Sequence, residues 1–84
     1  MKYCGKIIVV LKEGVFDPQG VTICNALHTL GYGEVVGVKT GKFFEVMVEV
    51  ESLELARKRI QEMCDQLLAN PVIERYSFEV EVGK

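Results

Sequence analysis

Residues 6–20 read KIIVVLKEGVFDPQG, and this stretch sets the start of the fold. The run from Ile7 to Leu11 is rich in β-branched residues and apolar on both faces of a pleat, as a central strand requires. Asp17 is a good helix N-cap, and Pro18 suits the first helical position. The stretch therefore predicts a central strand, a loop that contains glycine, and a helix over about residues 18–30.

The predicted first helix carries apolar residues at helical spacing, and Gly31 ends it. This stripe consists of Ile23, Cys24, Leu27 and Leu30.

Two strands are predicted after this helix. Valines at positions 35, 36 and 38 mark the first, and the alternating apolar residues of the stretch 44–50 mark the second. Thr40-Gly41-Lys42 between them is short enough for a hairpin with glycine at the turn. Phe43 and Met47 fall on the other, partly polar face of the second strand, where a lone monomer would leave them exposed.

A second helix is predicted over about residues 53–69, with Ser52 as its cap. Asn70 tolerates the left-handed conformation that ends a helix, and Pro71 prevents continuation because it has no amide hydrogen. A last strand then alternates apolar and charged residues up to Val82. The apolar stripe of the second helix is Ala56, Ile60, Met63, Cys64 and Leu67.

The predicted order βαββαβ folds most simply as a ferredoxin-like α+β structure, with residues 1–84 in one domain. Both helices then cover one face of an antiparallel sheet, and the opposite face, with Ile8 and Val10, stays uncovered. A chain this short hides only about 60% of the surface that its unfolded form exposes. We therefore expect a homodimer or a dimer of dimers, formed through the sheet or through strand exchange, two modes that the sequence leaves open.

Composition narrows the class of partner. The net charge is −2, and the one dense basic run, residues 57–59, is interleaved with acidic residues, which argues against nucleic acid as a partner. No apolar run reaches the length that spans a membrane. The three cysteines are odd in number and far apart in sequence, so they match neither a disulfide framework nor a zinc site, and a cytoplasmic location is expected.

Catalytic chemistry is sparse in the sequence. His28 lies one turn after Cys24, but two ligands do not make a metal site. Gly41-Lys42 lacks the rest of a phosphate-binding loop, and no serine has a histidine and an acid as partners. We therefore expect no catalytic residue and no metal site, and a chain that assists an enzyme.

The segments that join strands to helices resemble a known family. Residues 11–20 and the Asn70-Pro71-Val72-Ile73-Glu74 turn, together with Leu30-Gly31-Tyr32 and Met63-Cys64, are similar to PurS, the small subunit of phosphoribosylformylglycinamidine (FGAM) synthase. The resemblance covers nearly the whole chain. It implies a non-catalytic structural subunit in purine biosynthesis that bridges a glutaminase subunit and an ATP-dependent synthetase subunit and supports internal ammonia transfer. It also implies that ATP and magnesium bind to the synthetase and not to this chain.

The matching segments also suggest which residues matter. We expect partner contacts from four residues whose types the backbone does not require, namely Lys12, Glu13, Gln19 and Glu74. The other residues are of types that turns and helix caps need for their backbone conformation, namely Gly14, Asp17, Pro18, Asn70 and Pro71.

Two other functions are compatible with the same fold. One is a free-standing dimeric regulatory module that binds a small ligand such as an amino acid, for which Gly14 offers a weak version of the required glycine loop. The other is a small dimeric isomerase, in which His28 would have to supply the acid or base.

Overall fold

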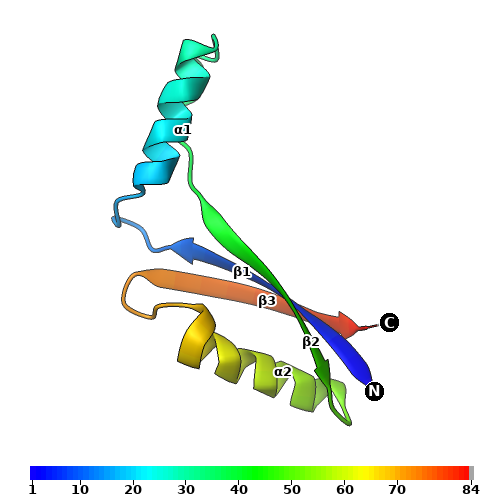
Figure 1. Ribbon diagram of the computed structural model, residues 1–84. Coiled ribbons are helices and arrows are strands. Elements are labelled where there is room, and N and C mark those ends of the chain that lie inside the picture. The colour runs from blue at the N-terminus through cyan, green and yellow to red at the C-terminus, as the bar shows by residue number, and fades with distance from the viewer. Residues whose placement is uncertain (84) are drawn as a thin grey trace.

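The computed structural model of the chain describes residues 1–83 and shows an α+β fold with three antiparallel strands and two α-helices (Figure 1). The elements in chain order are β1 (Lys2–Leu11), α1 (Pro18–Thr29), β2 (Gly41–Glu49), α2 (Leu53–Met63), the π-helical turn η1 (Cys64–Leu68) and β3 (Glu74–Val82). β1 lies at the centre of the sheet, between β2 and β3.

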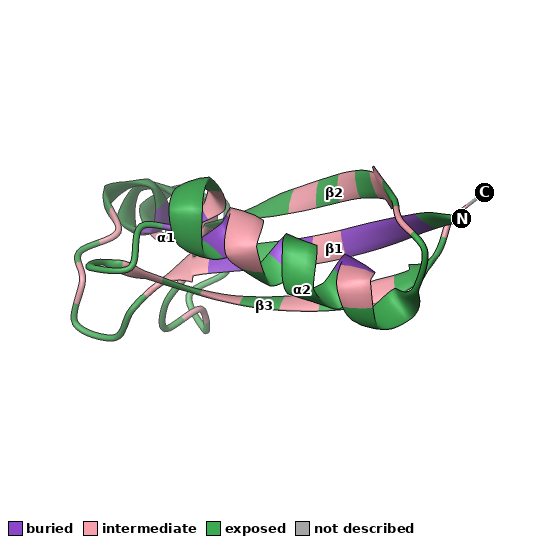
Figure 2. Ribbon diagram, turned by 90° about the horizontal axis from the view of Figure 1, so that it is seen from below, coloured by how far each residue is buried: buried purple, intermediate pink, exposed green. Residues whose placement is uncertain are grey.

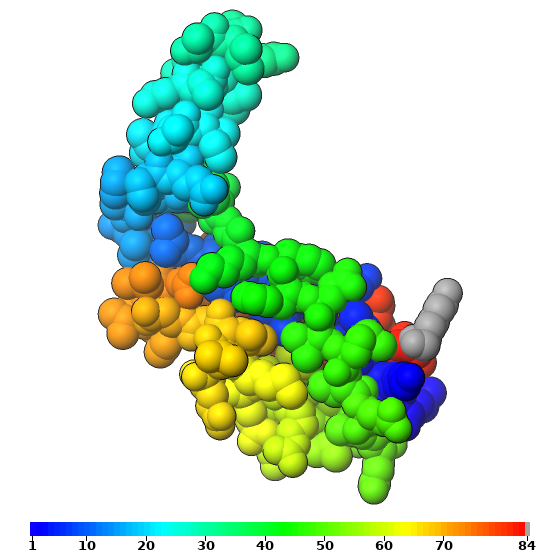
Figure 3. Space-filling model, viewed as in Figure 1, coloured from blue at the N-terminus to red at the C-terminus, as the bar shows by residue number. Residues whose placement is uncertain are grey.

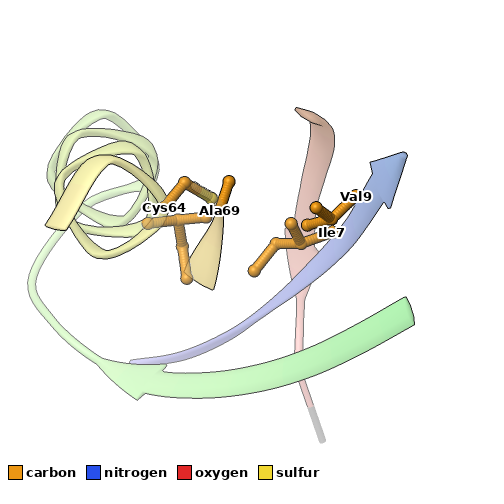
Figure 4. Packing of buried hydrophobic residues seen from close by; sticks show 5 residues of the cluster. Ile7, Val9, Cys64 and Ala69 are labelled. Carbon is orange, nitrogen blue, oxygen red and sulfur yellow. The ribbon is translucent and has the colours of Figure 1, made fainter. Parts of the chain in front are cut away.

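The core lies between the sheet and α2. Ile7 of β1 is paired with Phe44 of β2 on one side and with Phe78 of β3 on the other, and it is fully buried. Figure 2 shows that the buried residues gather on β1 and on the side of α2 that faces it. Ile7 and Val9 point from β1 toward Cys64 and Ala69 (Figure 4). The prediction of an apolar central strand is confirmed, and that strand begins earlier, at Lys2.

The opposite face of the sheet is uncovered, as the sequence predicted. Three apolar side chains on it are half exposed, Ile8 at 50%, Phe43 at 56% and Met47 at 51%. A charged pair lies beside them, with Lys6 Nζ 2.9 Å from Glu81 Oε1. The carboxylate raises the pKa of Lys6 through this contact. The face is therefore mixed, with its apolar part over β1 and β2.

The predicted hairpin between residues 35 and 50 is wrong. Among residues 1–83 the sheet has three strands, and residues 35–40 form none of them. The physical reason lies at Thr40, whose amide hydrogen and hydroxyl both bond to the carboxylate of Asp17. The backbone around Thr40 is therefore held against the start of α1 and does not turn to pair with β2. The four-stranded ferredoxin-like arrangement is corrected to three strands.

The predicted packing of α1 is also wrong. We call residues 17–40 the arm, and it stands clear of the sheet and of α2 (Figures 1 and 3). The chain has a radius of gyration of 16.5 Å, whereas a compact chain of this length has about 12 Å. The apolar stripe that was expected to join the core lies outside it, with Ile23 39% and Leu30 73% exposed and the other two residues of the stripe half-buried.

The starts of both helices follow the predicted caps. Asp17 accepts a hydrogen bond from Gly20 N at 2.9 Å, and Ser52 accepts one from Leu55 N at 3.2 Å. Gly31, after α1, has φ +105°, a conformation that favours glycine. These caps explain why the helices begin where the sequence indicated.

The end of the second helix departs from the predicted pattern. Its last turn is a π-turn, which rotates the following residues relative to an α-helix. Leu67, expected in the core, is 82% exposed, while Leu68 lies half-buried against the core. Asn70 is not left-handed, because no residue other than glycine among residues 1–83 has a positive φ. Its side chain instead accepts from Val72 N at 3.0 Å and forms the turn.

The hydrogen bond between Tyr76 and Asp65, next to the π-turn, leads to a testable prediction. The hydroxyl of Tyr76 donates to Asp65 Oδ1 at 2.7 Å, and this bond, with a smaller effect of burial, raises the pKa of Tyr76 to about 12 from an ordinary 10.0. The interaction therefore stabilises the fold fully below pH 10 and loses this effect as the pH rises through about 12. The tyrosinate absorbance of wild type minus that of Tyr76→Phe should show a midpoint near pH 12.

Asp65→Asn is the matching variant for this titration. It removes the carboxylate while keeping the size of the side chain, so the midpoint of Tyr76 should move back toward 10. An unchanged midpoint in Asp65→Asn would show that the hydrogen bond is not the cause.

Candidate partner interface at the end of the sheet

The two loops that the sequence singled out lie side by side at one end of the sheet. The amide of Lys12, just after β1, donates to Ile73 O at 2.8 Å, just before β3. Lys12 Nζ also donates to the carbonyl of Pro71. Residues 12–19 and 70–74 are therefore one surface, although more than fifty positions separate them in the sequence.

Glu74 fixes the second loop. Its Oε1 accepts from the amide of Asn70 at 2.7 Å, and its Oε2 lies 3.9 Å from Lys42 Nζ. Lys12 and Glu74 thus have bonds within the chain that the sequence did not reveal, since it indicated them as partner contacts.

Glu13 and Gln19 are more open. Glu13 Oε1 lies 2.9 Å from Lys39 Nζ, and both side chains are largely exposed. Lys39 lowers the pKa of Glu13 through this hydrogen bond and charge, so the carboxylate is ionised at neutral pH. Gly14, next in the loop, has φ +81°, which favours glycine there. Gln19 is exposed on the first turn of α1.

Asp17 does more than cap α1. Its Oδ2 accepts from Thr40 N at 2.8 Å, and both of its oxygens lie 3.0 Å from Thr40 Oγ1. These donors, with Gly20 N, lower the pKa of Asp17. The sequence indicated the cap but not Thr40, because Thr40-Gly41-Lys42 has the composition of a hairpin turn.

A shallow hollow joins these residues at the root of the arm. Polar and apolar side chains both line it, and the hydroxyl of Thr40 is engaged there in its bonds to Asp17. The lining side chains include Leu11, Asp17, Gln19, Thr40, Lys42 and Glu74.

His28 contacts both a cysteine of α1 and the returning chain. His28 Nε2 lies 2.7 Å from Val35 O and 3.8 Å from Cys24 Sγ, so the ring ties α1 to the returning chain. Burial raises the pKa of the Cys64 thiol, which keeps it protonated. Within residues 1–83 no group of three or more His, Cys, Asp or Glu side chains could hold a metal ion. No helix in the same residues is long and apolar enough to cross a membrane.

Comparison with known proteins identifies the family. The family described as PurS, phosphoribosylformylglycinamidine (FGAM) synthase, matches residues 5–82. The chain belongs to the PurS family. The PurS subunit of Bacillus subtilis strain 168 is 47% identical to it over 79 residues, which are 94% of this chain and 93% of that one.

Solved PurS structures have the same fold. PurS from Methanocaldococcus jannaschii superposes with a TM-score of 0.85 at 40% identity and covers 98% of this chain and 99% of that one. A chain in the structure of PurLQS from Thermotoga maritima superposes with a TM-score of 0.88 at 31% identity, over 96% of this chain and 99% of that one. As a PurS chain, the protein is a subunit of FGAM synthase, a ligase of purine biosynthesis. This membership decides against the regulatory module and the isomerase.

Proposed function

We propose that the chain is the non-catalytic bridging subunit of FGAM synthase. It holds a glutaminase subunit and a synthetase subunit together, so that ammonia released on one is used on the other without escaping. The observation that carries this proposal is the likeness to a chain of the PurLQS assembly from Thermotoga maritima. The surface where residues 12–19 and 70–74 meet supports it, because it brings exposed polar side chains of both loops together.

The chemistry then takes place on the partners. ATP and magnesium bind to the synthetase, and glutamine is hydrolysed on the glutaminase. Lys12, Glu13, Gln19 and Glu74 lie at the surface where the two loops meet, and we assign them to partner contact. The three cysteines are free thiols, which fits a cytoplasmic assembly.

We further propose that the chain is a homodimer in which the arm of each copy is covered by the other. No residue from 18 to 33 is Asp, Glu, Lys or Arg, although 26% of the chain is charged. A surface helix normally carries charges on its wet side, and an isolated helix of this length is marginal in water. Among residues 1–83, helix α1 makes no substantial contact with another helix or strand, and the returning chain lies against only part of it, so the cover for its remaining face must come from another polypeptide.

The solvent-accessible area of the chain is large enough for a second copy to be the polypeptide that covers α1. The chain exposes 6210 Å², whereas a folded monomer of 9.4 kDa exposes about 5,000 Å². The surplus of roughly 1,200 Å² exceeds the ~800 Å² that each partner buries in a standard interface. A place for the arm exists on the partner, because α2 alone covers the inner face of the sheet and leaves Phe44 and Val46 partly exposed. A second copy therefore supplies both the uncharged helix and the open sheet.

Reconstitution tests the bridging function. Purified glutaminase and synthetase subunits are mixed with and without the chain, and glutamine-dependent FGAM formation is followed. We expect this activity to be lost when the chain is omitted, while the synthetase keeps activity with added ammonia. Equal glutamine-dependent rates with and without the chain would refute the proposal.

A charge reversal tests the partner surface. Glu13→Lys replaces an exposed carboxylate that has no part in the core, so the isolated chain should keep its fold and mass. Its binding to the glutaminase and synthetase should weaken several-fold, because a rim charge alters association. Sedimentation of the mixture measures this. Glu51→Lys, the same change in the exposed loop at the other end of β2, is the control, and an equal loss in both variants would count against a specific surface.

A further inference from the structure

The arm is a two-layered structure that is tied together along its length. Helix α1 runs outward and residues 33–40 return beside it. His28 Nε2, near the far end, lies 2.7 Å from Val35 O. At the root, a Cβ on the buried Gly20 would collide with the carbonyl oxygen of Val38, so the first turn of α1 lies directly on the returning backbone.

Asp17 closes the root of this structure. One of its oxygens takes the amide of Gly20 and the other takes the amide of Thr40, while the hydroxyl of Thr40 bonds to both. We call this set of bonds the clasp. It joins the two points at which the arm leaves and re-enters the body, although 23 positions separate Asp17 from Thr40 in the sequence.

The clasp restricts where α1 can lie relative to the sheet of its own chain. Thr40 adjoins Gly41, where β2 begins, and β2 is paired along its length with β1. Because α1 is fixed to the chain that enters β2, it cannot fold back over its own sheet without breaking the clasp. The arm is thereby held in a direction away from the body, as Figure 1 shows.

We propose that Asp17 is a positioning residue for assembly, and that its clasp with Thr40 presets the arm for exchange with a second copy of the chain. The inference rests on the homodimer proposed above. A chain without the clasp has a mobile arm, which pays an additional ordering cost when it is placed on a partner and which is free to lie on its own sheet.

Asp17→Asn separates the clasp from the helix cap. Asparagine caps helices about as well as aspartate, so the bond from Gly20 N is kept. The Nδ2 of the asparagine then takes the place of the oxygen that faces Thr40 N, so two hydrogen-bond donors, Nδ2 and Thr40 N, face each other. Thr40→Val removes the hydroxyl bonds by a second route, and Thr40→Ser retains them. Glu51→Gln, which removes an exposed carboxylate in the loop at the other end of β2, is the control.

The test measures the dimer dissociation constant by sedimentation equilibrium and, at concentrations below it, the urea unfolding of the monomer. We expect Asp17→Asn to raise the dissociation constant at least about tenfold. Thr40→Val should have a smaller effect in the same direction, and Thr40→Ser and Glu51→Gln should stay near wild type. The free energy of unfolding of the monomer should be unchanged in all four variants. A general structural defect would lower it.

The outcomes separate the two proposals. If the wild type is a dimer and Asp17→Asn dimerises equally well, the clasp has no positioning role and the inference is overturned while the homodimer stands. If the wild type is a monomer at every concentration, the homodimer fails and the role of the clasp fails with it. A parallel loss of monomer stability in Asp17→Asn would also overturn the inference, because it would make Asp17 a residue of the fold alone.

Discussion

Replacing Ile23 with glutamate is expected to raise the dissociation constant of the dimer by at least about 100-fold, which corresponds to ~2.7 kcal/mol. Ile23 lies on the face of α1 that also carries Cys24 and Leu27, in a stretch that contains no formal charge. In the proposed dimer this face is buried on the partner, where a carboxylate would have no charged group to pair with. Sedimentation equilibrium of Ile23→Glu against wild type measures the change.

The polar face of the same helix provides the control. Asn25 lies on the other side of α1, because two positions turn an α-helix by about 200°. Asn25→Glu adds the same charge to the same helix and should leave the dissociation constant within a few-fold of wild type. A dimer that tolerates Ile23→Glu, or that is lost equally in both variants, would mean that this face of α1 is not the interface.

Ile60→Ala is expected to lower the free energy of unfolding by about 3 kcal/mol. Ile60 is fully buried, and its side chain fills the space over Gly5, where a Cβ would lie 2.7 Å from Ile60 Cδ1. Truncation leaves a cavity there, which the glycine cannot fill. Urea denaturation at one fixed chain concentration measures the loss, since dimerisation makes stability depend on concentration.

Leu67→Ala is the matched variant for this measurement. Helical spacing places Leu67 on the same stripe as Ile60, but the π-turn rotates it to 82% exposure. We expect its truncation to change the free energy of unfolding by no more than about 0.5 kcal/mol. A loss similar to that of Ile60→Ala would contradict the π-turn and restore the regular helix that the sequence predicted.

The parts of the fold that depend on local chemistry could be predicted from the sequence. Asp17 and Ser52 cap the two helices as expected, and β3 alternates as its residues do. Each of these features depends on neighbours within four positions along the chain. The central position of β1 was predicted for a similar reason, because its residues are apolar on both faces.

The features that could not be predicted depend on distant contacts. Valines 35, 36 and 38 have strand-like character, but tertiary contacts hold this segment against α1, through Val35 O at His28 and Thr40 N at Asp17. The apolar stripe of α1 indicates that the helix is buried without saying by which chain. The sequence assigned it to its own sheet, and the structure leaves it uncovered.

Part of the candidate site was also predictable. The sequence located both loops and the exposed Glu13, while the bonds of Lys12 and Glu74 within the chain became visible only when the loops were placed side by side. The missing signal was the pairing of β3 with β1, which brings residues 70–74 to the end of the first strand.

Hydrogen exchange of the α1 amides, measured across a dilution series of the wild-type chain, tests most directly whether the arm is closed by a second copy. We predict slow exchange for residues 21–30 at chain concentrations well above the dimer dissociation constant and fast exchange at concentrations well below it. The core amides of β1 should be protected at every concentration. Amides of α1 that exchange at the same rate at every concentration would contradict it.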